Sequence, residues 1–180
     1  MLYSYTKCIE LFGTDRKLKN ALQNKQIYKI EKGVYSDSEY ESELAVISMK
    51  YSNFIFTLNS AFYYHGLTDV IPDSYFLATP KEVKMIRDKR VKQKFENSSE
   101  FNLGVSKVIY NTTEIKMYNK ERMLVELIRN KNKLPFDYYK EILLNYRKIV
   151  NELDIQAIQE YAYVLPKTNM VLETFQLEVL

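Results

Sequence analysis

The sequence contains little of several residue types, and each shortage narrows what the chain can do. A single cysteine, Cys8, excludes an intrachain disulfide, and a single histidine, His65, excludes a metal site built from several histidines. Glycine and proline occur four times each, and no glycine-rich phosphate loop is present, which disfavours kinase and P-loop ATPase functions. No apolar run approaches the length of a membrane span and no signal peptide is evident, so we expect a soluble cytoplasmic protein without a membrane partner.

What is present indicates an ordinary folded chain with an uneven distribution of charge. Its 180 residues are 46% hydrophobic and 27% charged, which suits a small module beside a medium-sized domain. The formal net charge is only +3, but the segment from Thr14 to Gly33 holds six basic and two acidic side chains. The positive charge is therefore concentrated near the N-terminus.

The first 36 residues predict a helix, a break, a second helix and a hairpin. Ser4 can cap a helix over Tyr5–Phe12, in which Cys8 is a small buried hydrophobe, and Gly13 ends it. Thr14 can cap a second helix from 15 to about 24, with one apolar stripe and a basic remainder. Two short strand-like runs, 27–30 and 34–35, flank Gly33 and read as a hairpin. This order is typical of a winged helix-turn-helix, so we assign residues 1–36 to such a module.

Residues 37–180 predict a larger α/β domain with a small sheet and a C-terminal helical half, giving an α+β protein. Asn59 and Asn119 are candidate helix caps, and Asn111-Thr112 is a candidate turn between two strands. The expected helices are 39–50, 59–66, 81–94, 120–129, 134–150 and 153–165, the expected strands are 75–78, 105–110 and 114–118, and 170–180 is an apolar tail that docks back onto the domain.

The chemistry of the second helix suits DNA, because it offers cations for phosphates and amides for adenine edges. The wing would add further cations. On these residues alone, a structural interpretation is equally favoured, in which the segment is a short helical cap whose lysines keep it soluble. The expected DNA-binding residues are Thr14, Arg16, Lys17, Lys19, Asn20, Gln23, Lys29 and Lys32.

The chain resembles the AbiEi-like antitoxins of abortive-infection systems along nearly its whole length. The similar segments are the wing turn Lys32-Gly33-Val34-Tyr35, the segment from Phe56 to Asp69 with Ser60-Ala61 and His65-Gly66-Leu67, the turn Ala78-Thr79-Pro80, the segment from Tyr118 to Arg129, and the end Phe175–Leu180. Each motif is loose, and their order and spacing carry the resemblance. The chain departs from the family pattern by lacking the first winged-helix helix and by having Lys32 in place of the wing arginine.

The resemblance implies a DNA-binding autorepressor and antitoxin that phage-defence systems use. It implies binding to double-stranded DNA at inverted repeats in its own promoter and neutralisation of a nucleotidyltransferase-like toxin, with no catalytic residue, metal or cofactor. Because one module reads one half-site, we expect a monomer in solution. A basic corner suits the electronegative site of such a toxin; it comprises Arg129, Lys131 and Lys133.

Two other functions remain open. Asp73 and the Glu114-Ile115-Lys116 strand are similar to the Pro-Asp…Glu-X-Lys pattern of Mg²⁺-dependent restriction-type nucleases, in which Glu114 and Lys116 share a face. An exposed cross-strand charge pair explains the same residues more simply. The third reading is a protein-binding domain that has lost DNA binding. His65 is expected to be a packing residue or a charge at a helix end, and Arg122 a structural ion-pair residue.

Overall fold

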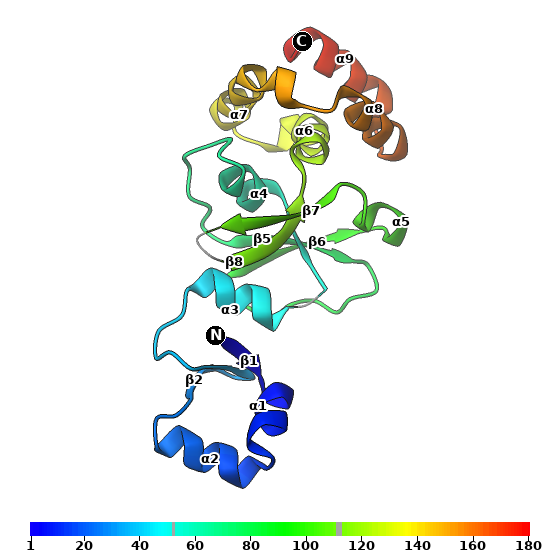
Figure 1. Ribbon diagram of the computed structural model, residues 1–180. Coiled ribbons are helices and arrows are strands. Elements are labelled where there is room, and N and C mark those ends of the chain that lie inside the picture. Colours follow the sequence, from blue (N-terminus) through cyan, green and yellow to red (C-terminus); the bar gives the residue numbers. More distant parts are fainter. Residues whose placement is uncertain (52, 111–112) are drawn as a thin grey trace. The chain divides into compact units, whose positions relative to one another are not determined.

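The computed structural model describes residues 1–51, 53–110 and 113–180 and divides the chain into two compact units, 1–53 and 54–180. Both mix helices and strands, in agreement with the expected α+β class (Figure 1). The predicted turn at Asn111-Thr112 lies outside the described residues. Within the described ranges, no helix is both long and apolar enough to cross a membrane.

Unit 1 is a three-stranded antiparallel sheet with three helices. Its elements are β1 (Leu2–Ser4), α1 (Tyr5–Phe12), α2 (Asp15–Gln23), β2 (Tyr28–Glu31), β3 (Val34–Ser36) and α3 (Glu43–Lys50), and the strand order is β1-β3-β2. The predicted caps are confirmed: the Ser4 hydroxyl accepts from the Lys7 amide at 3.1 Å, and the Thr14 hydroxyl accepts from the Lys17 amide at 3.3 Å. Strand β1 was not predicted, because three residues are too few to show a period.

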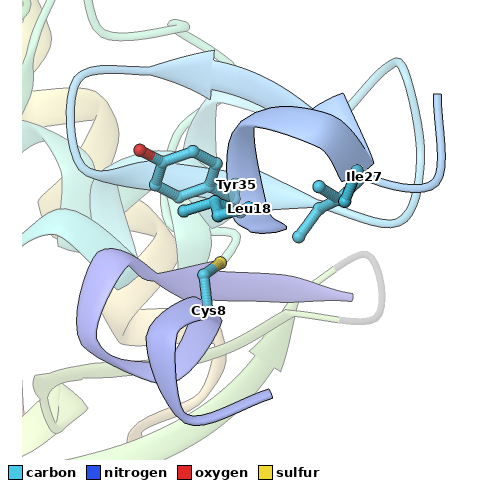
Figure 2. Close-up of a cluster of buried hydrophobic side chains, with 5 residues drawn as sticks. Cys8, Leu18, Ile27 and Tyr35 are labelled. Atoms are coloured by element: carbon cyan, nitrogen blue, oxygen red, sulfur yellow. The ribbon is translucent and has the colours of Figure 1, made fainter. Parts of the chain in front are cut away.

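The core of unit 1 is small and draws on α1, α2, the residue before β2, and β3. Figure 2 shows Cys8, Leu18, Ile27 and Tyr35 turned toward one space, and all four side chains are buried. Cys8 is fully buried, in agreement with the expected small hydrophobe, and burial raises the pKa of its thiol. Leu18 and Ala21 are the buried positions of α2, so this helix has a fixed inner face and a free outer one.

The boundary between the units lies after α3, whereas the sequence placed it at residue 36. The polar segment after β3 folds back, since the Ser36 hydroxyl donates to the Glu41 carboxylate and accepts from the Ser38 amide. Helix α3, capped by Ser42, then packs against β1 and β3 and buries Leu44, Val46 and Ile47. These apolar contacts join α3 to unit 1, and no local pattern in the sequence predicts them.

Unit 2 is built on a five-stranded mixed sheet in the order β6-β5-β4-β8-β7. The strands are β4 (Ile55–Phe56), β5 (Tyr75–Pro80), β6 (Val91–Glu96), β7 (Val105–Tyr110) and β8 (Thr113–Tyr118). The β5–β6 and β4–β8 pairs are parallel, and the β4–β5 and β7–β8 pairs are antiparallel. Along β8 the buried Ile115 and Met117 alternate with the exposed Glu114 and Lys116, as predicted.

Helices α4 and α5 contact β5 of this sheet, and α6 to α9 gather on one side of it as the C-terminal half of the unit (Figure 1). Helix α6 is the most deeply buried, because seven consecutive residues, 122–128, are inaccessible, and it contacts α4, α8 and α9. Asn119 caps it as predicted, accepting from the Arg122 amide at 2.9 Å. The helices are α4 (Leu58–Tyr64), α5 (Ser98–Phe101), α6 (Lys120–Arg129), α7 (Phe136–Lys148), α8 (Ile155–Val164) and α9 (Thr168–Glu178), with 3₁₀ turns at Lys131–Lys133 and Val150–Glu152.

Two expectations for unit 2 were wrong, and the docking of the apolar tail was correct. Residues 81–94 are not a helix: the chain is irregular up to Arg90 and then enters β6, because a six-residue parallel pairing with β5 outweighs local helix propensity. Helix α4 starts after Thr57 rather than after Asn59. The apolar tail does dock, but as a helix, with Val171 and Phe175 buried.

Candidate nucleic-acid interface

The outer face of α2 carries the side chains predicted to contact DNA. Arg16, Lys17, Lys19, Asn20 and Gln23 are all exposed, while Leu18 and Ala21 hold the helix to the core. Thr14 is exposed too, although its hydroxyl is occupied in capping the helix. The helix therefore presents a continuous polar face of donors on a rigid support.

The acidic side chains of this region are already neutralised within unit 1. Asp15 forms an ion pair with Lys19 at 2.8 Å. This interaction lowers the pKa of Asp15 and raises the pKa of Lys19. Glu31 pairs with Lys50 of α3 at 2.9 Å. Neither carboxylate therefore opposes the other cations of the segment.

Five cations in this part of unit 1 are exposed and have no ion-pair partner among the described residues. They occupy α2, the turn that follows it, strand β2 and the turn before β3, where Gly33 adopts a φ of +84°. One of them was not predicted from the sequence as a DNA-binding residue, because it lies in a turn rather than on a helix or a strand. The five are Arg16, Lys17, Lys25, Lys29 and Lys32, with Lys25 as the addition.

The predicted basic corner of unit 2 is only partly available. Arg129 donates to Glu126 at 2.9 Å and is largely buried, so it belongs to an internal network rather than to a surface. Lys131 lies 3.9 Å from Glu178. Lys133 is exposed, and no partner for it lies within the described residues.

The internal network is centred on the buried carboxylate of Glu126. Its oxygens accept from Arg122, Arg129 and Lys94, each at 2.9 Å, and from Asn130 at 3.1 Å. Burial by itself would raise the pKa of Glu126, but the positive charges outweigh burial and lower it. Arg122 is therefore a structural ion-pair residue, as predicted from the sequence.

The two acidic residues of the nuclease hypothesis form separate surface ion pairs. Asp73 pairs with Lys92 of β6 at 2.8 Å, and Glu114 pairs with Lys107 of β7 at 2.9 Å. Strand β4 separates β5, which follows Asp73, from β8, which carries Glu114 and Lys116. Among the described residues, no group of three or more His, Cys, Asp or Glu side chains is placed to hold a metal ion.

His65 ends helix α4 and bonds the backbone of β8. Its Nε2 lies 2.7 Å from the carbonyl oxygen of Tyr118. Burial lowers the pKa of His65, and the nearby Lys120 lowers it further. The bond to Tyr118 acts in the opposite direction but does not outweigh them. The neutral ring therefore donates to the carbonyl and ties α4 to the sheet, in line with the expected packing role.

Comparison of the chain with models of known protein families and with curated proteins finds no match. The geometry and charge of the chain itself are therefore the basis for assigning its function.

Proposed function

We propose that unit 1 binds double-stranded DNA, with α2 as its recognition helix and the β2–β3 hairpin as its wing. The observation that carries the proposal is the set of five unopposed cations on α2, its following turn and the wing. Cations that are free of internal partners can replace the counterions of phosphates without first breaking a protein ion pair. Asn20 and Gln23 add amides that can bond adenine edges in the major groove.

The order of elements in unit 1 supports this proposal. Two helices joined by a short break and followed by a two-stranded wing are the arrangement of winged helix-turn-helix modules. The family resemblance implies a further helix before the first of these two. In this chain α3, which follows the wing, packs against β1 and β3 and covers apolar surface that would otherwise be exposed.

Replacing the free cations by alanine should weaken DNA binding and its salt dependence. We expect the pairs Arg16→Ala with Lys17→Ala, and Lys29→Ala with Lys32→Ala, each to lower the slope of log K against log salt by roughly 2, since each lost phosphate contact removes about 0.9. Asn20→Ala should instead relax sequence preference at a cost of about 1–3 kcal/mol. Fluorescence anisotropy on duplex DNA from upstream of the gene measures both effects.

Lys7→Ala is the matched control, because Lys7 is an exposed lysine on α1 that pairs with Glu10 at 2.9 Å. Its removal should leave affinity and slope unchanged. Equal slopes for the wild type and both double variants would overturn the assignment of α2 and the wing as the DNA-binding surface.

We further propose, from the family resemblance, that the protein is an autorepressor and antitoxin whose partner is a nucleotidyltransferase-like toxin. Such a toxin must hold phosphates and metal in an electronegative site, and a basic surface complements it. Of the residues proposed for this contact, Lys133 is the most accessible and Arg129 the least.

Co-expression with the toxin encoded beside this gene tests the antitoxin proposal. The full chain should restore growth, and Lys133→Glu should reduce the rescue several-fold in colony counts, since it reverses the charge offered to the toxin. The control, Lys140→Glu, changes an exposed lysine of α7 and should rescue fully. Failure of the wild-type chain to rescue would contradict the antitoxin role, and equal rescue by all three would remove Lys133 from the contact.

A further inference from the structure

The irregular segment before β6 is a second basic surface, in unit 2. Residues 81–92 contain six cations and two carboxylates. Four of the cations are exposed and have no ion-pair partner within the part of the chain that the structure describes. These four, which we call the loop cations, are Lys81, Lys84, Arg87 and Lys89.

The two carboxylates of this segment are bonded elsewhere. Both oxygens of Glu82 accept from the Ser98 hydroxyl at 2.9 Å, and a bond from its own backbone amide together with Ser98 lowers the pKa of Glu82. Asp88 accepts from the Arg90 guanidinium at 2.7 Å and 3.0 Å. Asp88 is therefore neutralised by Arg90 inside the segment. Glu82 keeps its charge beside Lys81, so the loop cations outnumber the one carboxylate that is not paired with a cation.

The segment is anchored rather than loose. The side chain of Gln93 on β6 accepts from the Ile86 amide at 2.7 Å and donates to the Lys84 carbonyl at 3.4 Å. The Lys81 amide bonds the Glu96 carbonyl at 3.0 Å at one end, and the Arg90 carbonyl accepts from the Tyr75 amide at 2.7 Å at the other. A backbone held in this way loses little conformational freedom when its side chains bind a ligand.

We propose that the loop cations form a second DNA-binding surface, which contacts phosphates of the duplex independently of α2 and the wing. The inference rests on the proposed DNA-binding function and extends it to unit 2. Four cations that are not paired with carboxylates are suited to contact a phosphate backbone. The affinity of a protein for DNA phosphates comes from charge neutralisation rather than from base recognition.

The composition of the segment favours nucleic acid over an acidic protein. Protein interfaces have an apolar, often aromatic centre and are depleted in lysine. Here lysine dominates, and Met85, 71% exposed, is the one large apolar side chain of the segment that is strongly exposed among the described residues. The charge therefore has no hydrophobic centre around which a protein partner would pack.

The test measures binding of the full chain to a labelled duplex of about 30 base pairs over a range of salt concentrations. The loop variant combines Lys81→Ala, Lys84→Ala, Arg87→Ala and Lys89→Ala. We expect it to lower the slope of log K against log salt by about 3–4, at about 0.9 for each phosphate contact, and to weaken binding at least about tenfold at low salt.

A control variant with the same change in net charge separates a local surface from a general field. It combines Lys107→Ala, Lys116→Ala, Lys140→Ala and Lys148→Ala, all exposed residues of β7, β8 and α7. Its slope should stay close to that of the wild type. A loop variant that matches this control overturns the inference, and so does a loop variant that binds DNA normally but no longer binds poly-glutamate, which would identify an acidic protein partner.

The α2 and wing variants in the same assay keep the two proposals apart. If those variants lose binding and the loop variant does not, the proposed function stands and the second surface is refuted. If only the loop variant loses binding, the recognition helix is refuted and the loop remains as the DNA-binding surface.

Discussion

Glu126→Gln should lower the free energy of unfolding of unit 2 by about 3–5 kcal/mol, the range found when one partner of a buried ion network is removed. The carboxylate of Glu126 is fully buried and accepts from three cations and one amide. Glutamine would leave Arg122, which is also fully buried, without its closest countercharge and would turn one acceptor into a donor facing other donors. Urea unfolding followed by circular dichroism measures the loss.

The matched control is Glu173→Gln on the exposed side of α9, which should change stability by no more than about 0.5 kcal/mol.

The pH dependence of the free energy of unfolding gives a second readout. Because the pKa of Glu126 is lowered in the folded state, its stabilisation is present above the ordinary glutamate pKa and is lost as the pH falls through the folded value. The variant should lose less stability on acidification. A cost below about 1 kcal/mol would show that the network does not hold α6 to β6.

Gly104→Ala should also be strongly destabilising, for a steric reason. Gly104 has a φ of +70°, and a Cβ there would lie 2.7 Å from Cβ of Arg122 and 2.9 Å from Oδ1 of Asn119. The strained backbone should cost about 1–3 kcal/mol, and the overpacking against the start of α6 a further 1–3 kcal/mol. The Gly104 carbonyl also accepts from the Asn119 amide at 2.7 Å, so the clash would disturb the helix cap.

Gly66→Ala isolates the backbone contribution. Gly66 has a nearly identical φ of +69°, but nothing lies within 4 Å of a Cβ built there. The difference between the two alanine variants in urea unfolding therefore measures the clash alone. Equal losses in the two variants would contradict close packing of the loop before β7 against α6.

Local patterns in the sequence were enough to predict several elements correctly. Ser4, Thr14 and Asn119 were predicted as helix caps, and each accepts a bond from the amide three residues on. The stripe of Leu18 and Ala21 faces the core of unit 1, and the alternation along β8 matches its buried and exposed faces. Capping and periodicity succeed because the interactions that decide them lie within a few residues.

The errors occur where distant residues decide the conformation. The charged segment 81–94 has helix-forming residues, but pairing with β5 and the bonds of Gln93 make it a loop and a strand. Arg129 looked like part of an exposed basic corner, and only the fold places it against the carboxylate of Glu126. The same fold leaves the loop cations without ion-pair partners among the residues that the structure describes.

The sequence by itself determined the α+β class, the caps and the basic character of α2 and the β2–β3 hairpin, because composition and short-range hydrogen bonding suffice for these. The tertiary structure decided which charges are free. Lys19 and Arg129 are held by carboxylates, whereas Arg16, Lys17 and the loop cations have no such partner among the described residues. An ion pair depends on distance in space, and the chain sets that distance only when strands and helices far apart in sequence pack together.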